Sequence, residues 1–561
     1  MLLIDFVAYY MFFLKGLLVF TAIVIIISSF DDLFFDVVYW VRVTRRWFVF
    51  RHKYKPLEAE ALFVPAQKPF AVMVPAWQES DVIAHMVKNT LRTFDYDNYH
   101  MFIGCYQNDP ATQTEVDKLT EEYPQVHKVV VPRDGPTCKA DCLNWLIQGI
   151  KLQEEKQDYD FAGIVMHDAE DVVHRLELRL FNFLVDRKDL MQLPVFSLER
   201  KWYEFTAGHY IDEFAEAHTK DMLVREELIG EVPSAGVATC FSRRAIAALA
   251  AENNNTVFNT DSLTEDYDIS FRLKALGMAQ IFLRYGVMAT VRKTSPFTGK
   301  VRTVRQRDYV ATREYFPNSI TTAKRQKSRW ILGIVFQGWR TIGWHGNILV
   351  RYVLFRDRKA LLTSLATFCA YFIFANILTL RVLDFLFGDF YEFPSIVEIG
   401  SFPWWLIVFN IFFLINRILH RMLFTTRIYG WEQGLLSFPR MIVGNYVNFL
   451  ATARALRLFI MHVFFGHKLV WDKTDHAYPS SEELAHMKQR LGELLIERNL
   501  ITQHALATAL DTQKNQKKPL GEILLQMEAI TIDDLAGALA QNLGISEAEA
   551  RHKLLNKGVA H

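Results

Sequence analysis

Residues Ile164 to Asp171 read Ile-Val-Met-His-Asp-Ala-Glu-Asp, and this stretch decides the fold. The apolar run that begins at Phe161 stops abruptly at a group of carboxylates. Such a run is typical of a buried strand that delivers acids to the carboxyl edge of an open α/β sheet, where ligands bind. Two carboxylates two residues apart can share a hard divalent cation with substrate phosphates. Taken alone, the pattern also fits an acidic helix start after a strand.

Apolar runs and amphipathic stretches alternate around this strand. Short β-rich runs are expected at 70–75, 101–106, 128–131 and 161–166, with helices near 80–93, 112–122 and 139–155. A βαβα series of this kind predicts a mostly parallel sheet covered by helices on both faces. No Gly-x-Gly-x-x-Gly follows the first run, so a dinucleotide-binding fold of that type is not indicated.

The composition indicates a membrane protein with soluble parts. The 561 residues are 51% hydrophobic and include 44 Phe, which gather in a few long runs. Spans are expected at 8–30, 360–380 and 403–418. Arginines and lysines follow the first span, precede the second and follow the third, so these sides are expected in the cytoplasm. The net charge of +1 gives no reason to expect a nucleic-acid partner, and the five scattered Cys do not form a disulfide framework.

Two further apolar stretches carry arginines among their aromatic residues. Residues 331–345 and 431–465 are therefore expected to be helices that lie in the membrane interface. The alternative is a fourth crossing at 441–465, which would place the C-terminal segment outside the cytoplasm.

The last 80 residues are polar, helical and duplicated with an offset of 29. Leu491-Gly492-Glu493 matches Leu520-Gly521-Glu522, and Ile501-Thr502 matches Ile530-Thr531. Self-similarity at a fixed period indicates repeated supersecondary units.

Several strand ends and helix starts carry side chains that can bind a sugar nucleotide. Glu79 in the first strand-end loop can accept hydroxyl hydrogens, and Lys139 at a helix start suits a pyrophosphate. A carboxylate at Asp266 could act as a general base, Arg329 could neutralise a leaving diphosphate, and Trp330 offers a flat apolar face to a sugar. Each pattern alone also fits a helix cap, a solvated lysine or an anchor of the neighbouring interface helix.

Six motifs occur in one order: Val74-Pro75-Ala76-x-x-Glu79, Asn108-Asp109, Lys139-Ala140-x-x-Leu143-Asn144, Asp168-Ala169-Glu170, Thr264-Glu265-Asp266 and Gln326-x-x-Arg329-Trp330. This set, from about residue 68 to 345, resembles the inverting, membrane-bound, polymer-forming glycosyltransferases of family 2, relatives of cellulose and hyaluronan synthases. With Tyr106–Pro110 and Trp471–Thr474 added, it resembles the phage-adsorption protein B glycosyltransferases of bacteria. The resemblance implies a GT-A (Rossmann-like) α/β domain.

The resemblance also implies a role for each matched position. The uridine nucleotide would be held by Pro75, Ala76, Glu79 and Asp109. Lys139 would lie near the diphosphate, and Asp168, also a substrate-binding residue, would hold Mg2+ or Mn2+ with Glu170. Asp171 is a rival to Glu170 as the second metal ligand. Asp266, with Glu265 beside it in the catalytic motif, would deprotonate the acceptor hydroxyl. The acceptor sugar and leaving diphosphate would be bound by Gln326, Arg329 and Trp330, and 236–243 would line the acceptor region.

The tail resembles the tandem cyclic di-GMP-binding motif of type II secretion and pilus ATPases. The resemblance implies nucleotide contacts from Arg490, Leu491, Gly492 and Gln513 in the first copy and from Leu520, Gly521 and Gln541 in the second. This chain departs from the motif where Asn499 and Glu528 replace glycine and where Asn542 replaces the second closing glutamine. A helical docking domain without a ligand is the alternative.

Four parts are expected: a membrane helix with a basic linker (1–67), the GT-A domain (68–330), interface helices with two membrane helices (331–478) and a regulatory tail (479–561). The expected protein is a multi-pass enzyme of the bacterial inner membrane with its catalytic and C-terminal domains in the cytoplasm. It would transfer sugar from a UDP-sugar to a growing envelope polysaccharide under cyclic di-GMP control. The resemblance points to an N-acetylhexosamine as that sugar. Two spans after the catalytic domain cannot enclose a pore, so an export partner, oligomerisation or a lipid acceptor that receives one sugar is expected. A nucleotide-sensing scaffold without catalysis is the alternative from another class.

Overall fold

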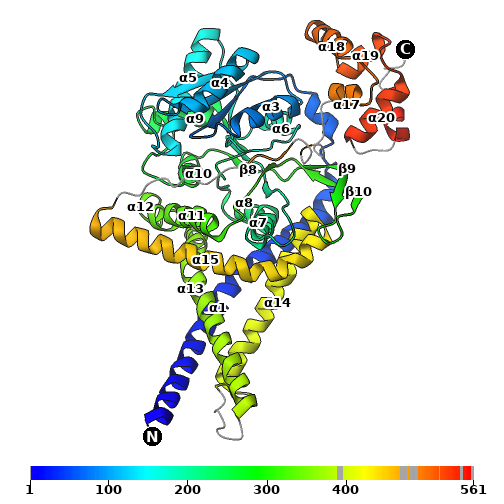
Figure 1. Ribbon diagram of the computed structural model, residues 1–561. Helices are drawn as coiled ribbons and strands as arrows, with labels where there is room; N and C mark the ends of the chain where they lie inside the picture. The colour runs from blue at the N-terminus through cyan, green and yellow to red at the C-terminus, as the bar shows by residue number, and fades with distance from the viewer. Residues whose placement is uncertain are drawn as a thin grey trace.

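The computed structural model describes residues 2–387, 396–467, 477–480, 484, 491–516, 518–543 and 547–556. A seven-stranded sheet forms the centre of the upper body (Figure 1), in the order β3-β2-β1-β4-β7-β5-β8. Its strands are β1 (Phe70–Pro75), β2 (Tyr99–Tyr106), β3 (Val126–Val131), β4 (Gly163–Met166), β5 (Leu190–Gln192), β7 (Thr239–Ser242) and β8 (Gln280–Phe282). Only β7 runs antiparallel to its described neighbours, β4 and β5. The predicted α/β fold with a mostly parallel sheet is confirmed.

Both faces of the sheet are buried, because alternate residues of each strand enter two separate cores. Val72 and Val74 of β1 pack in one core, whereas Ala71 and Met73 pack in the other. The first core is covered by α3 (Ile83–Thr93), α4 (Pro110–Glu122) and α6 (Glu177–Leu184), and the second by α5 (Lys139–Gln157), α8 (Met222–Ile229), α9 (Arg243–Glu252) and α10 (Glu265–Ala275). The continuous apolar runs in the sequence follow from this two-sided burial.

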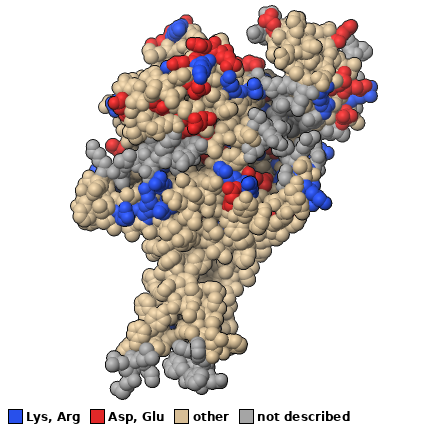
Figure 2. Space-filling model, in the orientation of Figure 1, with Lys and Arg blue, Asp and Glu red and all other residues tan. Residues whose placement is uncertain are grey.

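Four helices are long and apolar enough to cross a membrane: α1 (Leu2–Arg45), α13 (Ile348–Phe387), α14 (Phe402–Tyr429) and α15 (Trp431–Phe465). In Figure 1, α1, α13 and α14 extend away from the sheet as one stalk, while α15 runs crosswise where the stalk meets the upper body. The part of the stalk described in Figure 2 shows almost no Lys, Arg, Asp or Glu. The three expected spans fall within α1, α13 and α14, and α15 is also long and apolar enough to cross, so the interface orientation expected for 431–465 stays a prediction.

The segment before α13 contacts α15 and the loop before α10. It comprises α11 (Ile320–Ile331), the π-helix η4 (Leu332–Gln337) and the short α12 (Gly338–Thr341). Helix α7 (Phe205–Glu216) packs on both α14 and α15. The buried Arg440 of α15 pairs with Asp212 of α7 at 3.0 Å, so a desolvated ion pair fixes α15 to α7.

A β-hairpin connects three parts of the molecule. It consists of β9 (Gly286–Thr294) and β10 (Val301–Tyr309), and it is followed by β11 (Thr312–Glu314), which pairs with β6 (Val195–Ser197). At the tip, Ser295 Oγ donates to Glu432 of α15 at 2.8 Å. The tail helix α20 (Ile532–Leu543) contacts β9.

The duplicated tail folds as two matching units. Helices α17 (Leu491–Glu497) and α18 (Gln503–Gln516) form one unit, α19 (Leu520–Gln526) and α20 form the other, and α21 (Glu547–Asn556) follows. Asn499 and Glu528, 29 residues apart, both have left-handed backbones, with φ of 55° and 54°. Glycine is the residue that adopts this conformation without strain. The two departures from the motif therefore lie at positions whose backbone conformation favours glycine.

Candidate active site

The loop after β4 is fixed by a buried histidine. His167 Nδ1 lies 2.7 Å from Asp171 Oδ2, and Nε2 lies 2.6 Å from Glu177 Oε1. Burial alone would lower the pKa of His167, but Glu177 and Asp171 outweigh it and raise that pKa to about 10. The Asp168 backbone N–H also donates to Asp171 Oδ2 at 3.0 Å. Asp171 is fully buried, and its Oδ2 holds the loop while its Oδ1 has no hydrogen-bond partner among the described residues. Asp168, Glu170 and Asp171 thus all stay candidate metal ligands.

Lys139 joins three of the predicted motifs. At the start of α5 its Nζ lies 2.6 Å from Asp168 Oδ1 and donates to the Gly236 carbonyl at 3.0 Å. Burial alone would lower the pKa of this ammonium, but Asp168 and Glu265 outweigh it and raise the pKa above its usual range. Lys139 is thus the counter-ion of the acid cluster as well as a group at a helix N-terminus.

Glu265 and Asp266 lie in the first turn of α10, where the helix dipole favours carboxylates. Asp266 faces Gly236, because a Cβ added to Gly236 would lie 2.8 Å from Asp266 Oδ2 and 3.4 Å from Lys139 Nζ. Burial raises the pKa of Asp266, and Lys139 and Arg329 oppose that rise. Burial, followed by the charge of Asp266, raises the pKa of Glu265 to about 7. The pair is poised to hold and release a proton near neutral pH.

Helix α11 supplies the cationic side of the site. The positive charge of Arg329 opposes the raised pKa values of both Glu265 and Asp266. Gln326 Oε1 and Arg329 Nε are buried and have no hydrogen-bond partner among the described residues. Buried polar atoms of this kind call for a ligand or water. The Trp330 ring packs against Tyr210 and Phe214 of α7, with centroids 6.3 and 6.2 Å apart.

The predicted nucleotide loop follows β1 at the same sheet edge. Asp109 accepts hydrogen bonds from Gln78 N at 2.6 Å and Thr112 N at 3.3 Å, so it ties this loop to the start of α4. Glu79 N donates to Thr112 Oγ1 at 3.0 Å. Gln78 adopts a positive φ of 56° although it is not glycine. Strain of this kind gathers at functional sites. Pro75 ends β1, and Ala76 N donates to the Gly104 carbonyl of β2 at 2.8 Å.

One carboxylate at the site was missed by the sequence prediction. Glu314 ends β11, and burial together with the charges of Asp171, Glu170 and Asp168 raises its pKa well above the usual range. The backbones of Val172 and Arg313 exchange hydrogen bonds at 2.8 and 2.9 Å, so β11 is held directly beside the acid loop. No pattern in the sequence marks Glu314, because a lone Glu in a polar hairpin is typical of a solvated surface residue.

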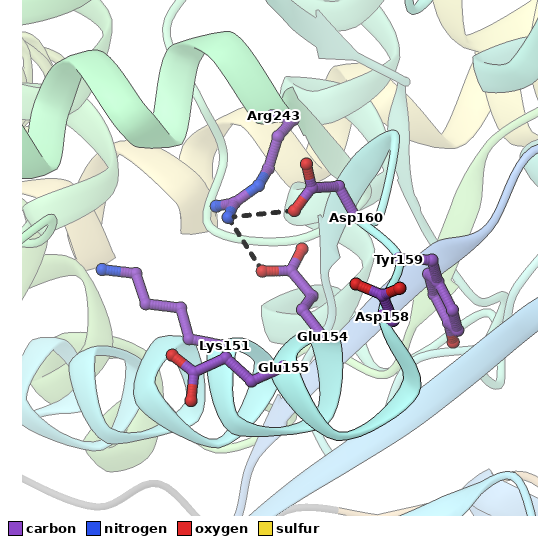
Figure 3. A pocket seen from close by; sticks show the side chains of 7 residues that line it. All are labelled: Lys151, Glu154, Glu155, Asp158, Tyr159, Asp160 and Arg243. Atoms are coloured by element: carbon purple, nitrogen blue, oxygen red, sulfur yellow. Dashed lines mark ion pairs between the residues drawn. The ribbon is translucent and has the colours of Figure 1, made fainter.

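The acceptor region predicted at 236–243 is wrong at its far end. Strand β7 runs antiparallel to β4, so Thr239 lies opposite Met166 near the acids while Ser242 lies opposite Gly163 at the other edge of the sheet. Arg243 there pairs with Glu154 at 2.9 Å and Asp160 at 3.6 Å (Figure 3). These residues line a polar hollow of about 340 Å³ at the end of α5. Only Gly236, at the near end of this segment, is shown to contact the predicted catalytic residues.

Some of the residues predicted to bind a ligand in the tail lie among the described residues. Gly492 and Gly521 pack against Leu506 and Leu535, where an added Cβ would lie 2.5 and 2.9 Å from the leucine side chains. Gln513 Nε2 donates to the Lys518 carbonyl at 3.0 Å. Arg490, the side chain of Gln541 and the stretch 471–474 lie outside the described residues. A hollow of about 460 Å³ lies beside the first unit, lined by Ile496, Asn499, Leu500, Ile501, Thr502, Gln503, Ala505 and Ala529.

Known proteins match this chain at two levels. The model of the glycosyl transferase family group 2 matches residues 163–384. Bacteriophage adsorption protein B of Escherichia coli K12 is 45% identical over 510 residues, which cover 91% of this chain and 68% of that protein. Bacteriophage N4 adsorption protein B of Escherichia coli O157:H7 matches to the same extent.

Two solved structures also resemble the chain. They are the mannosyltransferase PcManGT from Pyrobaculum calidifontis in complex with GDP-Man and Mn2+ (14% identity, 76% of this chain, 99% of that chain, TM-score 0.42) and TarS from S. aureus (11%, 73%, 98%, 0.28). At these TM-scores the likenesses are too slight to support an inference. The family match, together with the mixed sheet flanked by helices, agrees with the predicted GT-A class. The chain is therefore a family 2 glycosyltransferase that belongs to the family of bacteriophage adsorption protein B.

Proposed function

We propose that the protein transfers a sugar with inversion from a UDP-sugar to a growing envelope polysaccharide at the inner face of the bacterial inner membrane. The observation that carries this proposal is Lys139, which joins Asp168, Gly236 and the Glu265–Asp266 pair into one charged centre. Residues 68–330 would form the catalytic unit. Uridine would lie along the loop 75–79 and Asp109, and the diphosphate beside Lys139 and Arg329.

In this proposal Asp266 removes the proton from the acceptor hydroxyl as that oxygen attacks the sugar, and the bond from the sugar to the diphosphate breaks. Arg329 and Lys139 offset the charge on the departing UDP. Gln326 and Trp330 would orient the acceptor sugar.

A divalent cation fits the acid cluster. Burial, followed by the charges of Asp171, Glu170 and Asp168, raises the pKa of Glu314, so these carboxylates feel one another's charge. Among the residues that the structure describes, no three His, Cys, Asp or Glu side chains converge on one point that could hold a metal ion. Mg2+ is commonly held by one or two carboxylates together with substrate phosphates. Asp168 and Glu170 would hold Mg2+ or Mn2+, which offsets the charge of the diphosphate.

The test is UDP release by the purified full-length protein with a panel of UDP-sugars, including UDP-N-acetylhexosamines. We expect release with one of them, its loss in chelator and its recovery with added Mg2+ or Mn2+. Failure of every UDP-sugar, with another sugar nucleotide active, would contradict the proposed donor. Activity that persists in chelator would contradict the metal.

A single-sugar transfer to a membrane lipid is the second candidate. It is favoured by the stalk, in which only α1, α13 and α14 extend from the catalytic body (Figure 1). Three helices do not enclose a polymer channel, so the polysaccharide proposal requires an export partner or oligomerisation. Chain-length analysis of the products distinguishes the two, since a lipid with one added sugar would exclude polymerisation.

We propose further that the tail binds cyclic di-GMP and raises transfer activity. The matching contacts, Gly492 with Leu506 and Gly521 with Leu535, support the proposal that both repeats keep the fold of the ligand-binding motif. Cyclic di-GMP should stimulate the full-length protein, and deletion after residue 478 should abolish the stimulation. Equal activity of the intact protein with and without the nucleotide would remove this regulatory proposal.

A further inference from the structure

Two exposed aromatic side chains lie in the loop between β6 and α7. Trp202 and Tyr203 are 46% and 57% exposed, and their rings stand perpendicular with centroids 5.8 Å apart. Large apolar side chains held in solvent usually mark a binding surface when they cluster. Neither residue belongs to the motifs assigned above.

The loop is fixed at both ends to elements of the catalytic centre. Leu198 N donates to the Glu314 carbonyl at 2.8 Å, so the loop starts beside the strand that carries Glu314. The Glu204 carboxylate accepts from Lys201 N at 3.0 Å and from Asn318 Nδ2 at 3.4 Å, directly before α11. The two aromatic residues therefore sit on an ordered turn between the acid cluster and α11.

The residues just before the exposed pair and just before α11 also contact one another. The Arg200 guanidinium lies 4.1 Å from the centre of the Tyr315 ring, so the loop packs on the segment that joins β11 to α11. In the same segment Phe316 is buried and stacks on Tyr210, whose ring meets Trp330 edge-on at 6.3 Å. Trp202 and Tyr203 follow Arg200 in the chain and are exposed to solvent.

We infer that Trp202 and Tyr203 form an outer subsite for the saccharide acceptor, beyond the sugar beside Trp330. The inference rests on the proposed function. Aromatic rings offer sugars a flat apolar face while the sugar hydroxyls remain in water. A subsite at this distance would contact the part of the acceptor away from its reacting end, so long acceptors would bind more tightly than short ones.

The experiment compares a disaccharide and a hexasaccharide of N-acetylglucosamine on the full-length protein in detergent. Calorimetry without donor measures binding, and UDP release with the active donor gives the KM of each acceptor. In Trp202→Ala/Tyr203→Ala we expect hexasaccharide affinity to fall by about tenfold. The disaccharide KM and acceptor-free UDP release should stay unchanged, and Trp202→Phe should restore most of the loss. Trp339→Ala, which removes an exposed ring of α12 at the membrane side, is the control.

Three results would overturn the inference. The wild-type protein could bind both oligomers equally, the double variant could weaken both equally, or it could lose binding to phospholipid vesicles with its hexasaccharide affinity intact. The last result would assign the pair to the membrane surface. Failure of every UDP-sugar in the panel would refute the donor alone, because the calorimetric comparison does not depend on turnover.

Discussion

At the scale of single residues, the protonation of the site depends on a few cations that lie among a larger number of carboxylates. Lys139 and Arg329 are the cations that oppose the raised pKa of Asp266. Burial therefore raises the pKa of Glu265 and Asp266, while the two cations lower it. The protonation of Asp266 and Glu265 is therefore sensitive to small changes in burial or in neighbouring charge.

Asp266→Asn tests the assignment of the base. The amide keeps the shape of the side chain but cannot take a proton, so transfer should fall by about 10²- to 10⁴-fold. UDP binding, measured by calorimetry, should be retained. Near-normal turnover would refute the assignment.

The pH dependence of transfer tests the electrostatics of the same pair. Burial raises the pKa of Asp266 and, with the charge of Asp266, raises that of Glu265 to about 7. The base Asp266 must be ionised and its pKa is raised, so kcat/KM should fall with decreasing pH already above the ordinary carboxyl range. An acid limb that begins only near the ordinary carboxyl pKa of about 4 would show that the pair is not desolvated in solution.

His167→Gln tests the buried pairs beneath the acid loop. The substitution leaves Asp171 and Glu177 buried without their cation and should cost about 3–5 kcal/mol in unfolding free energy. Since the folded pKa is raised to about 10, this stabilisation is fully present below the unfolded histidine value of about 6.5 and is lost as pH rises through about 10. Thermal unfolding of both proteins across this range measures it. A constant difference would contradict the charged state of His167.

At the scale of elements, the alternation of apolar patterns along the chain predicted the strands and helices better than single side chains predicted the site. The first strand and the helices at 110–122 and 139–157 lie where alternating apolar periods placed them, because two-sided burial leaves a strong pattern. The same pattern could not reveal Glu314, whose position depends on a hairpin that folds back beside the acid loop. Nor could it reveal that Arg243 faces away, because an antiparallel strand reverses which end meets the site.

Gly236→Ala tests the contact between the segment before β7 and α10. Gly236 has φ of 77°, and an added Cβ would lie 2.8 Å from Asp266 Oδ2. We expect transfer to fall at least tenfold as the carboxylate is displaced, beyond a backbone strain of about 1–2 kcal/mol. Gly230→Ala is the matched control, since φ there is 62° and no atom lies within 4 Å of the added Cβ. Equal activity losses in the two variants would attribute the effect to backbone strain alone.

At the scale of the whole molecule, the arrangement of α15 decides on which side of the membrane the tail lies. Single cysteines can be introduced at Ile399, between α13 and α14, and at Ala507 in the tail, with the five native cysteines replaced. In intact spheroplasts we expect a membrane-impermeant maleimide to label position 399 and to reach position 507 only after permeabilisation. Labelling of 507 from outside would show that α15 crosses the bilayer.

The hairpin of β9 and β10 has a mechanical consequence. Its tip holds Glu432 at the start of α15, one strand supports the tail, and its continuation β11 carries Glu314 to the acid loop. A displacement at one of these three contacts would be passed along the hairpin backbone to the other two. We therefore expect the lipid around α15 to act on the same carboxylates as a ligand bound to the tail, so that bilayer composition would change the rate of transfer.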